Sequence, residues 1–220
     1  MKFSDILASI IHDMKNSLGM VINILDELAL ENEDQDNPKI STLQHESKRL
    51  NNNLIALLSL YKIENEKLTA NIEEINVDDF LEEIVIDNQT LAKAKGIQLE
   101  YVCEAGLSGY FDEWLIRGAI NNLIGNGVRY TSTKILISAE MVDGFLVFRI
   151  EDDGTGFPAS MIDAQAAFNR NKSLSEGHTQ LGIYFASMVA ATHRNGSREG
   201  YLELSNQQQL AGGCCSIWLP

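Results

Sequence analysis

The stretch FLVFRIEDDGTGFP, residues 145–158, runs from an apolar segment straight into a turn with two spaced glycines. Its apolar half predicts a buried strand over 145–151. Gly154 and Gly156 let backbone approach a ligand without a Cβ in the way. Asp152 stands two residues before the first glycine, where a buried carboxylate can accept a hydrogen bond from an exocyclic amine such as that of adenine. Taken alone, an Asp-Gly turn is also compatible with a plain connection.

Around this stretch, the chain after residue 76 mixes two kinds of periodicity. Apolar residues three and four positions apart predict helices, and alternating or short apolar runs predict strands. The mixture predicts an α+β two-layer sandwich with helices on one face of a mixed sheet, and a loop over 157–179. The predicted helices are 77–95, 112–129 and 181–192, and the other predicted strands are 97–102, 134–140, 201–205 and 214–219.

The N-terminal part has helical periodicity only. An amphipathic pattern covers 3–30, an acidic turn follows, and the pattern resumes after Pro38 as far as about residue 67. Two helices alone are too thin for a core, so their apolar stripes favour pairing with a second copy. We therefore expect an α-helical hairpin over 1–68 that forms a homodimeric four-helix bundle. A hinge linker over 69–76 and the sandwich over 77–220 complete the predicted organisation.

Composition excludes several classes of function. The 220 residues carry 17 Lys and Arg against 31 Asp and Glu, a formal charge of −14, which argues against nucleic acid as the main partner. No apolar run approaches the length of a membrane span. The three cysteines show no metal-ligand spacing, and their odd number fits a reduced, cytoplasmic compartment.

Three further segments could carry chemistry. His12 and Asn16 share a helix face with Asp13 adjacent, and a neutral imidazole is a good nucleophile near pH 7. Asn122 and Asn126 also lie one helical turn apart, and amide oxygens suit Mg²⁺. Residues 177–182 lie at a loop-to-helix junction, where backbone N–H groups favour phosphate. Each segment alone has an ordinary structural reading as well, as a solvated helix face or a turn.

The order of these segments resembles that of the two-component sensor histidine kinases, from about residue 4 to residue 220. The matching segments are HDMKN (12–16) with the phospho-acceptor box, NLIGNGVRY (122–130) with the N box, DDGTGFP (152–158) with the first glycine box, HTQLGI (178–183) with the second glycine box, and GGCCSIWLP (212–220) with the terminal strand motif. The resemblance implies a HisKA-like dimerisation hairpin followed by a Bergerat-type (GHKL) ATPase sandwich.

The resemblance also implies roles in an autokinase. His12 would accept the γ-phosphoryl group of ATP, with Asp13 as its base or orienter. Asn16 would position water if the protein also acts as a phosphatase. The phosphoryl group would then pass to an aspartate of a response-regulator receiver domain.

On the nucleotide side, the resemblance implies ATP and Mg²⁺ as cofactors. Asn126 would ligate the metal with support from Asn122, Arg129 would contact phosphate, and Asp152 would bind the adenine amine. The other residues implied to bind the cofactor are Tyr130, Gly154, Gly156, Arg170 in a looser lid match, Thr179, Leu181 and Gly182.

Two departures leave alternatives open. His178 and Gln180 stand where the family's second glycine box has glycines. This favours, as one alternative, a histidine phosphotransferase or phosphatase adaptor with impaired use of ATP. A non-catalytic regulator that heterodimerises with another kinase is the other alternative. Because only eleven residues precede His12, we expect input from a separate sensor protein or from a ligand of the ATPase domain.

Overall fold

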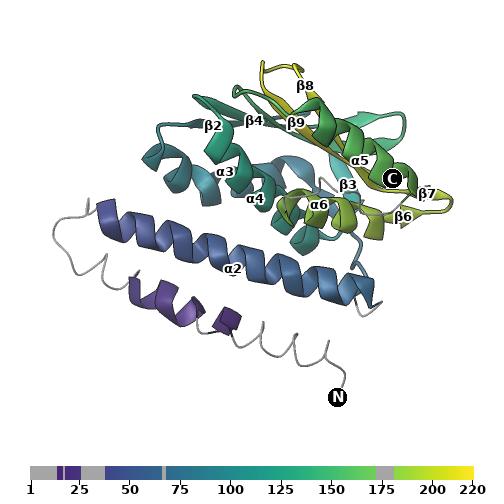
Figure 1. Cartoon of the computed structure of the whole chain (residues 1–220). Helices are drawn as coiled ribbons and strands as arrows, with labels where there is room; N and C mark the ends of the chain where they lie inside the picture. The colour runs from purple at the N-terminus through teal and green to yellow at the C-terminus, as the bar shows by residue number, and fades with distance from the viewer. Residues whose placement is uncertain (1–13, 17, 26–37, 66–67, 172–180) are drawn as a thin grey trace. The chain divides into compact units, whose positions relative to one another are not determined.

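The structure is a computed structural model that describes residues 14–16, 18–25, 38–65, 68–171 and 181–220. The chain divides into two compact units, Met1–Leu68 and Thr69–Pro220. In the first unit, residues 14–16 and 18–25 are helical and α2 spans Pro38–Glu64 (Figure 1). Proline suits the first position of α2, because the N–H it lacks has no partner there. Among the described residues, no helix is long and apolar enough to cross a membrane. The four-helix bundle stays a prediction.

The second unit is built on a five-stranded mixed sheet, as the sequence predicted. Its spatial order is β2-β4-β5-β9-β8, in which β2 and β4 are parallel and the other neighbours antiparallel. The strands are β2 (Gln98–Cys103), β4 (Lys134–Val142), β5 (Phe145–Asp152), β8 (Tyr201–Asn206) and β9 (Gly213–Leu219).

Three helices cover one face of this sheet (Figure 1). They are α3 (Val77–Ala94), α4 (Glu113–Tyr130) and α6 (Leu181–Thr192). Between the layers, the rings of Phe80, Phe111 and Phe148 meet edge to face, with centroids 5.1–5.8 Å apart. This aromatic cluster joins α3 to the middle of β5, the strand that leads to the glycine-rich turn.

Asp112 fixes the start of α4. Its Oδ1 accepts the N–H of Leu115 at 2.9 Å, as an N-cap does, and its backbone N–H donates to Nε2 of His193 at 3.0 Å. Nδ1 of that buried imidazole faces the carbonyl of Val189 at 2.8 Å. Since Nε2 accepts, Nδ1 carries the proton of a neutral ring. Burial lowers the pKa of His193, and the Val189 carbonyl and the Asp112 charge offset only part of that effect.

Two parts of the second unit differ from the prediction. The predicted loop over 157–179 contains the helix α5 (Ala159–Asn171), and the predicted linker over 69–76 contains the strand β1 (Glu73–Asn76). β1 pairs antiparallel with β3 (Ser108–Phe111), and the N–H of Asn71 donates to Oδ2 of Asp112 at 2.8 Å. The chain is therefore already attached to the second unit at Asn71. A short hairpin, β6 (Arg194–Asn195) with β7 (Arg198–Glu199), follows α6.

Candidate nucleotide-binding site

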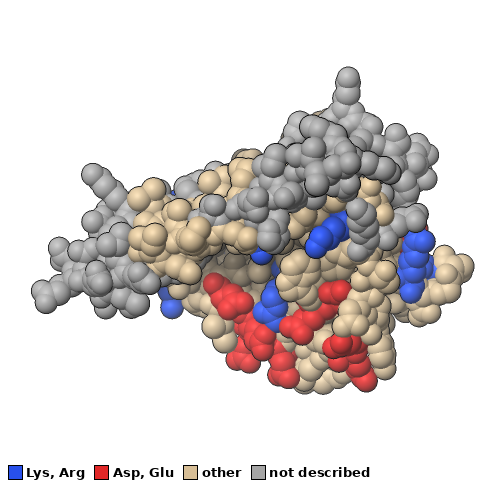
Figure 2. Space-filling view, turned by 90° about the horizontal axis from the view of Figure 1, so that it is seen from below, with Lys and Arg blue, Asp and Glu red and all other residues tan. Residues whose placement is uncertain are grey.

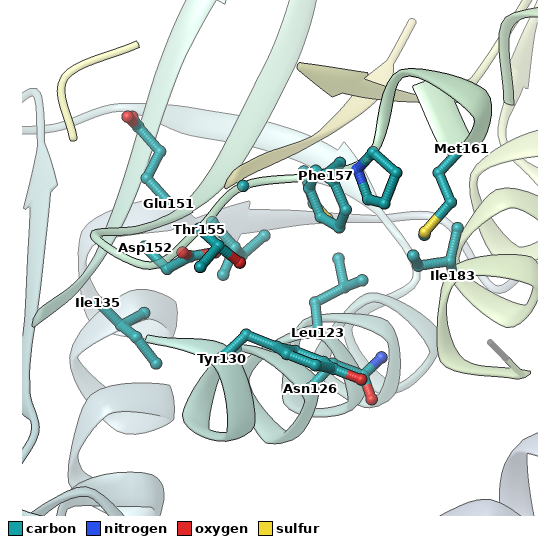
Figure 3. Close-up of a pocket in the computed structure, with 15 residues that line it drawn as sticks. Leu123, Asn126, Tyr130, Ile135, Glu151, Asp152, Thr155, Phe157, Met161 and Ile183 are labelled. Atoms are coloured by element: carbon teal, nitrogen blue, oxygen red, sulfur yellow. The ribbon is translucent and has the colours of Figure 1, made fainter. Parts of the chain in front are cut away.

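A cavity of about 280 Å³ lies where β5 ends, between α4 and the start of α6. Its walls are mostly apolar, with a few polar side chains, which is the usual make-up of a small-molecule site. Figure 3 shows Tyr130 and Asn126 on one side of this space and Phe157 on the other. The lining residues are Leu123, Asn126, Gly127, Tyr130, Ile135, Ile150, Glu151, Asp152, Thr155, Gly156, Phe157, Pro158, Met161, Ile183 and Cys215.

Asp152, the last residue of β5, offers a carboxylate to the cavity. Its Oδ1 accepts the N–H of Gly154 at 2.8 Å, which fixes the orientation of the group. Its Oδ2 accepts no hydrogen bond from the described residues. Because the side chain is half-buried and surrounded by apolar groups, that oxygen can accept a hydrogen bond from a ligand amine.

The next residue, Asp153, has a different role. Its Oδ2 accepts a hydrogen bond from the hydroxyl of Thr133 at 2.5 Å. Its Oδ1 accepts hydrogen bonds from the hydroxyl of Thr131 at 2.7 Å and from the N–H groups of Ser132, Thr133 and Lys134 at 2.9–3.1 Å. Burial alone would raise the pKa of Asp153, but these hydrogen bonds outweigh it and hold the pKa well below its usual value. Asp153 therefore fastens the turn between α4 and β4.

Glu151 is fully buried but does not serve the cavity with its charge. Figure 3 shows its carboxylate turned away from the other lining side chains. Oε2 accepts the N–H groups of Gln209 at 2.8 Å and Leu210 at 3.2 Å. Of the three consecutive acidic residues, two therefore hold loops and only Asp152 is available to a ligand.

Asn126 lines the cavity from α4, and α6 begins directly against it. A Cβ on Gly182 would lie 2.7 Å from Nδ2 of Asn126 and 3.6 Å from Cβ of Asn122, so glycine permits this close approach of the two helices. Nδ2 of Asn126 is buried without a hydrogen-bond partner among the described residues. An amide oxygen at this wall is a ligand that Mg²⁺ accepts together with phosphates and waters. No cluster of three metal-ligating His, Cys, Asp or Glu exists within the described residues.

Gly154 packs against protein. A Cβ there would lie 2.1 Å from the carbonyl oxygen of Tyr130, a contact that backbone cannot avoid without moving. Gly156 lines the cavity and has a φ of 76°, which an L side chain rarely adopts. The first glycine lets the turn reach the end of α4, and the second shapes the cavity wall.

The structure brings together part of the predicted site. Asn126, Tyr130, Asp152 and Gly156 line one cavity. Asn122 supports this wall through its contact with Gly182, its Nδ2 donating to the carbonyl of Gly118 at 3.0 Å. Leu181 begins α6, and Arg129 is exposed near the end of α4.

For the remaining predicted residues, the structure describes no side chain at the cavity. Arg170 lies in α5, and its side chain is not described. Asn16 is helical and exposed in the first unit. His12, Asp13 and Thr179 lie outside the described residues.

The sequence did not identify the apolar walls. Thr155 and Phe157 belong to the glycine-rich stretch over 145–158, so their position in the sequence could have indicated that they line the site. The sequence gives no such signal for three other wall residues, because an apolar residue that lines a cavity cannot be told in sequence from one that fills a core. These residues are Met161, Ile183 and Cys215. Cys215 is fully buried, and burial raises the pKa of its thiol well above the usual value.

Acidic side chains gather on the face seen in Figure 2. Arg117 of α4 contacts three carboxylates, with distances of 2.6 Å to Glu83, 2.7 Å to Glu113 and 3.5 Å to Asp87. Arg129, at the cavity end of α4, has no ion-pair partner among the described residues. It is therefore the α4 cation that stays available to an anionic ligand group.

Comparisons with known proteins agree with this arrangement. A family model described as histidine kinase-, DNA gyrase B-, and HSP90-like ATPase matches residues 111–220. The sensor-like histidine kinase SenX3 of Mycolicibacterium smegmatis is 26% identical over 203 residues, which cover 88% of this chain and 52% of the relative. The chain thus spans about half the length of that relative.

Two solved structures share the fold at low identity. The Acinetobacter baumannii histidine kinase AdeS gives a TM-score of 0.63 at 18% identity and covers 94% of this chain and 96% of its own. Full-length ShkA in complex with AMPPNP gives a TM-score of 0.64 at 19% identity, covering 97% of this chain and 44% of its own. At such identities the likeness speaks for the fold alone.

Proposed function

The chain belongs to the histidine kinase-, DNA gyrase B-, and HSP90-like ATPase family, and on that premise we propose that it is an ATP-dependent protein-histidine kinase of a two-component system. The observation that carries the proposal is the free oxygen of Asp152 in a mostly apolar cavity that also contains Asn126. The cavity thus holds a carboxylate oxygen that can accept a hydrogen bond from a base amine and an amide that can bind a metal ion held by phosphate. The AMPPNP complex of ShkA is a precedent in a protein of the same fold.

In the proposed site, each residue has one task. Asp152 accepts the adenine amine, and the apolar walls exclude water from the base. Asn126 holds Mg²⁺, with Asn122 behind it, and Arg129 contacts phosphate. Mg²⁺ neutralises charge on the phosphates and helps align them for transfer. Positioning and charge neutralisation are what phosphoryl transfer chiefly requires.

The proposed acceptor is His12 in the first unit. A neutral imidazole nitrogen attacks the γ-phosphorus, ADP leaves with the bridging oxygen, and Asp13 orients the ring or takes its proton. The phosphoryl group then passes to an aspartate of a receiver domain, and Asn16 positions water when the protein acts as a phosphatase. Support for this part comes from SenX3, a histidine kinase by name, whose likeness covers 88% of this chain.

We propose a homodimer formed through the first unit. Leu43, Leu50 and Leu57 recur every seven residues along α2 and are 55%, 49% and 40% exposed. A stripe with this spacing is typical of a helix that packs against another. Leu50→Asp should therefore give a monomer in sedimentation, and an unchanged dimer would refute this interface. The free cysteines fit the proposed cytoplasmic location, and a separate protein or ligand would supply the signal.

The deciding experiment is incubation of the full chain with γ-labelled ATP and Mg²⁺. The expected label is acid-labile and base-stable, absent in His12→Gln and strongly reduced in Asp152→Asn at ATP concentrations near the wild-type Kd. His45→Gln is the matched control and should keep the label, because His45 belongs to α2 and stands outside the proposed acceptor box at 12–16.

Other outcomes separate the alternatives. Nucleotide binding without any label would refute the autokinase and favour a phosphotransferase or phosphatase adaptor. His178 and Gln180, which replace glycines of the family's second glycine box, would then account for the missing kinase activity. Neither binding nor label in a folded dimer would leave the non-catalytic regulator. Label that persists in His12→Gln would refute the proposed acceptor.

A further inference from the structure

Helix α5 supplies one side of the cavity. Met161, in its first turns, lines the cavity. Among the α5 side chains that the structure describes, Gln165 is the one that is fully buried, at 1% exposure. Among the described side chains of α5, a polar one is therefore the most deeply buried.

Gln165 is held by directed hydrogen bonds to two other elements. Its Nε2 donates to Oγ of Ser187 in α6 at 2.9 Å and to the carbonyl of Leu202 in β8 at 3.3 Å. Oγ of Ser187 in turn donates to the carbonyl of Ile183 at 3.0 Å. Hydrogen bonds fix distance and direction, which apolar burial does not.

The two partners stand one helical turn behind two cavity residues. Gln165 is four residues after Met161, and Ser187 is four residues after Ile183, so each pair shares a helix face. Met161 and Ile183 lie side by side in the cavity wall (Figure 3). The bond between Gln165 and Ser187 thus ties together the two helices at the turn that follows this wall.

We infer that Gln165 is a positioning residue that sets the spacing of the Met161–Ile183 wall of the nucleotide cavity. The inference rests on the proposed function, because it assigns a role within the nucleotide site. It adds a residue that touches no ligand and lies in a helix that the sequence did not predict. Misplacement of a wall weakens binding without removing any contacting group.

Gln165→Met tests the inference with little disturbance of the core. Methionine has a similar volume, and the partners keep other bonds. Ser187 still donates to Ile183, and the Leu202 carbonyl still accepts from Nδ2 of Asn169 at 2.6 Å. The substitution also removes the buried Oε1 of Gln165, which has no partner among the described residues. The urea midpoint should therefore stay near that of the wild type.

The measurement compares the Kd of ATP with that of adenosine in the full chain. Both should rise by the same factor, on the order of tenfold, because the inference assigns the wall to the part of the cavity that holds the nucleoside, which the two probes share. The apparent KM for ATP in labelling should rise with them, while the rate at saturating ATP stays unchanged. Gln89→Met, at a half-buried glutamine of α3 away from the cavity, is the control and should change neither Kd.

Ser187→Ala provides a second variant should Gln165→Met fold poorly. Its effect on Kd and that of Gln165→Met should be strongly non-additive in the double variant, since both break one bond. Full additivity, an unchanged Kd in folded Gln165→Met, or a rise for ATP alone would each overturn the inference. If the wild type binds neither ATP nor adenosine, the proposed function is refuted together with the inference. If the wild type binds both and the variants bind equally well, only the inference is refuted.

Discussion

Asp152 and Asp153 are adjacent, yet the structure predicts opposite consequences for their loss. Asp153→Ala removes the acceptor of five donors, two hydroxyls and three backbone N–H groups, at 2.5–3.1 Å. Water can reach these donors once the carboxylate is gone, so each lost bond should cost about 0.5–1 kcal/mol. The free energy of unfolding should therefore fall by about 2.5–5 kcal/mol. For a unit of this size that corresponds to a fall in Tm of roughly 5–20 °C.

Asp152→Asn should leave the fold intact. Its Oδ1 accepts one N–H, from Gly154, and an asparagine oxygen can do the same. The free energy of unfolding should therefore change by less than about 1 kcal/mol. The amide cannot also accept from a base amine, so the Kd of ATP should rise about tenfold to a hundredfold, the equivalent of one hydrogen bond to a charged group.

Urea denaturation followed by tryptophan fluorescence measures the stability difference in the correct unit. The chain has two tryptophans, Trp114 and Trp218, and both lie in the second unit. Calorimetric titration of ATP, at a temperature where each variant is folded, measures binding. Equal loss of stability in the two variants, or loss of ATP binding in folded Asp153→Ala, would refute the division of roles.

A pH series sharpens the test. The pKa of Asp153 is lower in the folded state than its usual value, so its stabilisation is present above about pH 4 and is lost as the pH falls below that value. The stability gap between the wild type and Asp153→Ala should therefore be constant at neutral pH and should shrink from about pH 4 downward. A gap that is unchanged at low pH would mean that packing, and not the ionised carboxylate, holds the turn.

Three further predictions concern single positions. Gly154→Ala should destabilise the fold by about 3 kcal/mol or more in urea melts, because the new Cβ would meet the Tyr130 carbonyl. Gly125→Ala is the control: its Cβ would lie in open space on the same helix as Tyr130, and it should stabilise the fold by about 1 kcal/mol. The pKa of His193 is lowered by burial, so the wild type should lose stability as the pH falls from about 7 to 5, and His193→Gln should lack this slope. Arg117→Met should cost less than about 1 kcal/mol, and raising the salt concentration should narrow the difference, because its three carboxylate partners are exposed.

Periodicity predicted most of the second unit because most of its elements bury one apolar face. It missed α5, in which the fully buried side chain among those described is the polar Gln165 and not an apolar residue. It also missed β1 and β3, which are four residues each and pair only with one another. Pairing of this kind depends on segments distant in the chain, which local pattern does not report.

The candidate site likewise contains residues that the sequence predicts and residues that it does not. Asp152 and Asn126 could be predicted because a polar residue in an apolar setting carries a chemical signal at a recognisable spacing. Met161 and Ile183 could not, because only the folded chain distinguishes a wall residue from a core residue. The role of Gly154 also needed the structure, since a glycine that packs against a carbonyl and one that faces a ligand look alike in sequence.

The cavity keeps its dimensions through contacts that no ligand touches. Helices α4 and α6 are joined at both of their ends. At the cavity end, Gly182 lets α6 approach Asn126 to within a distance that any Cβ would fill. At the far end, the buried ring of His193 accepts the N–H of Asp112. Close packing at one end and a hydrogen bond at the other restrict the movement of α4 relative to α6, which favours a fixed separation of Asn126 and Ile183 before a ligand arrives. Charging His193 removes the acceptor at the far end, and the pH range that weakens the fold should therefore also be the range in which nucleotide affinity declines.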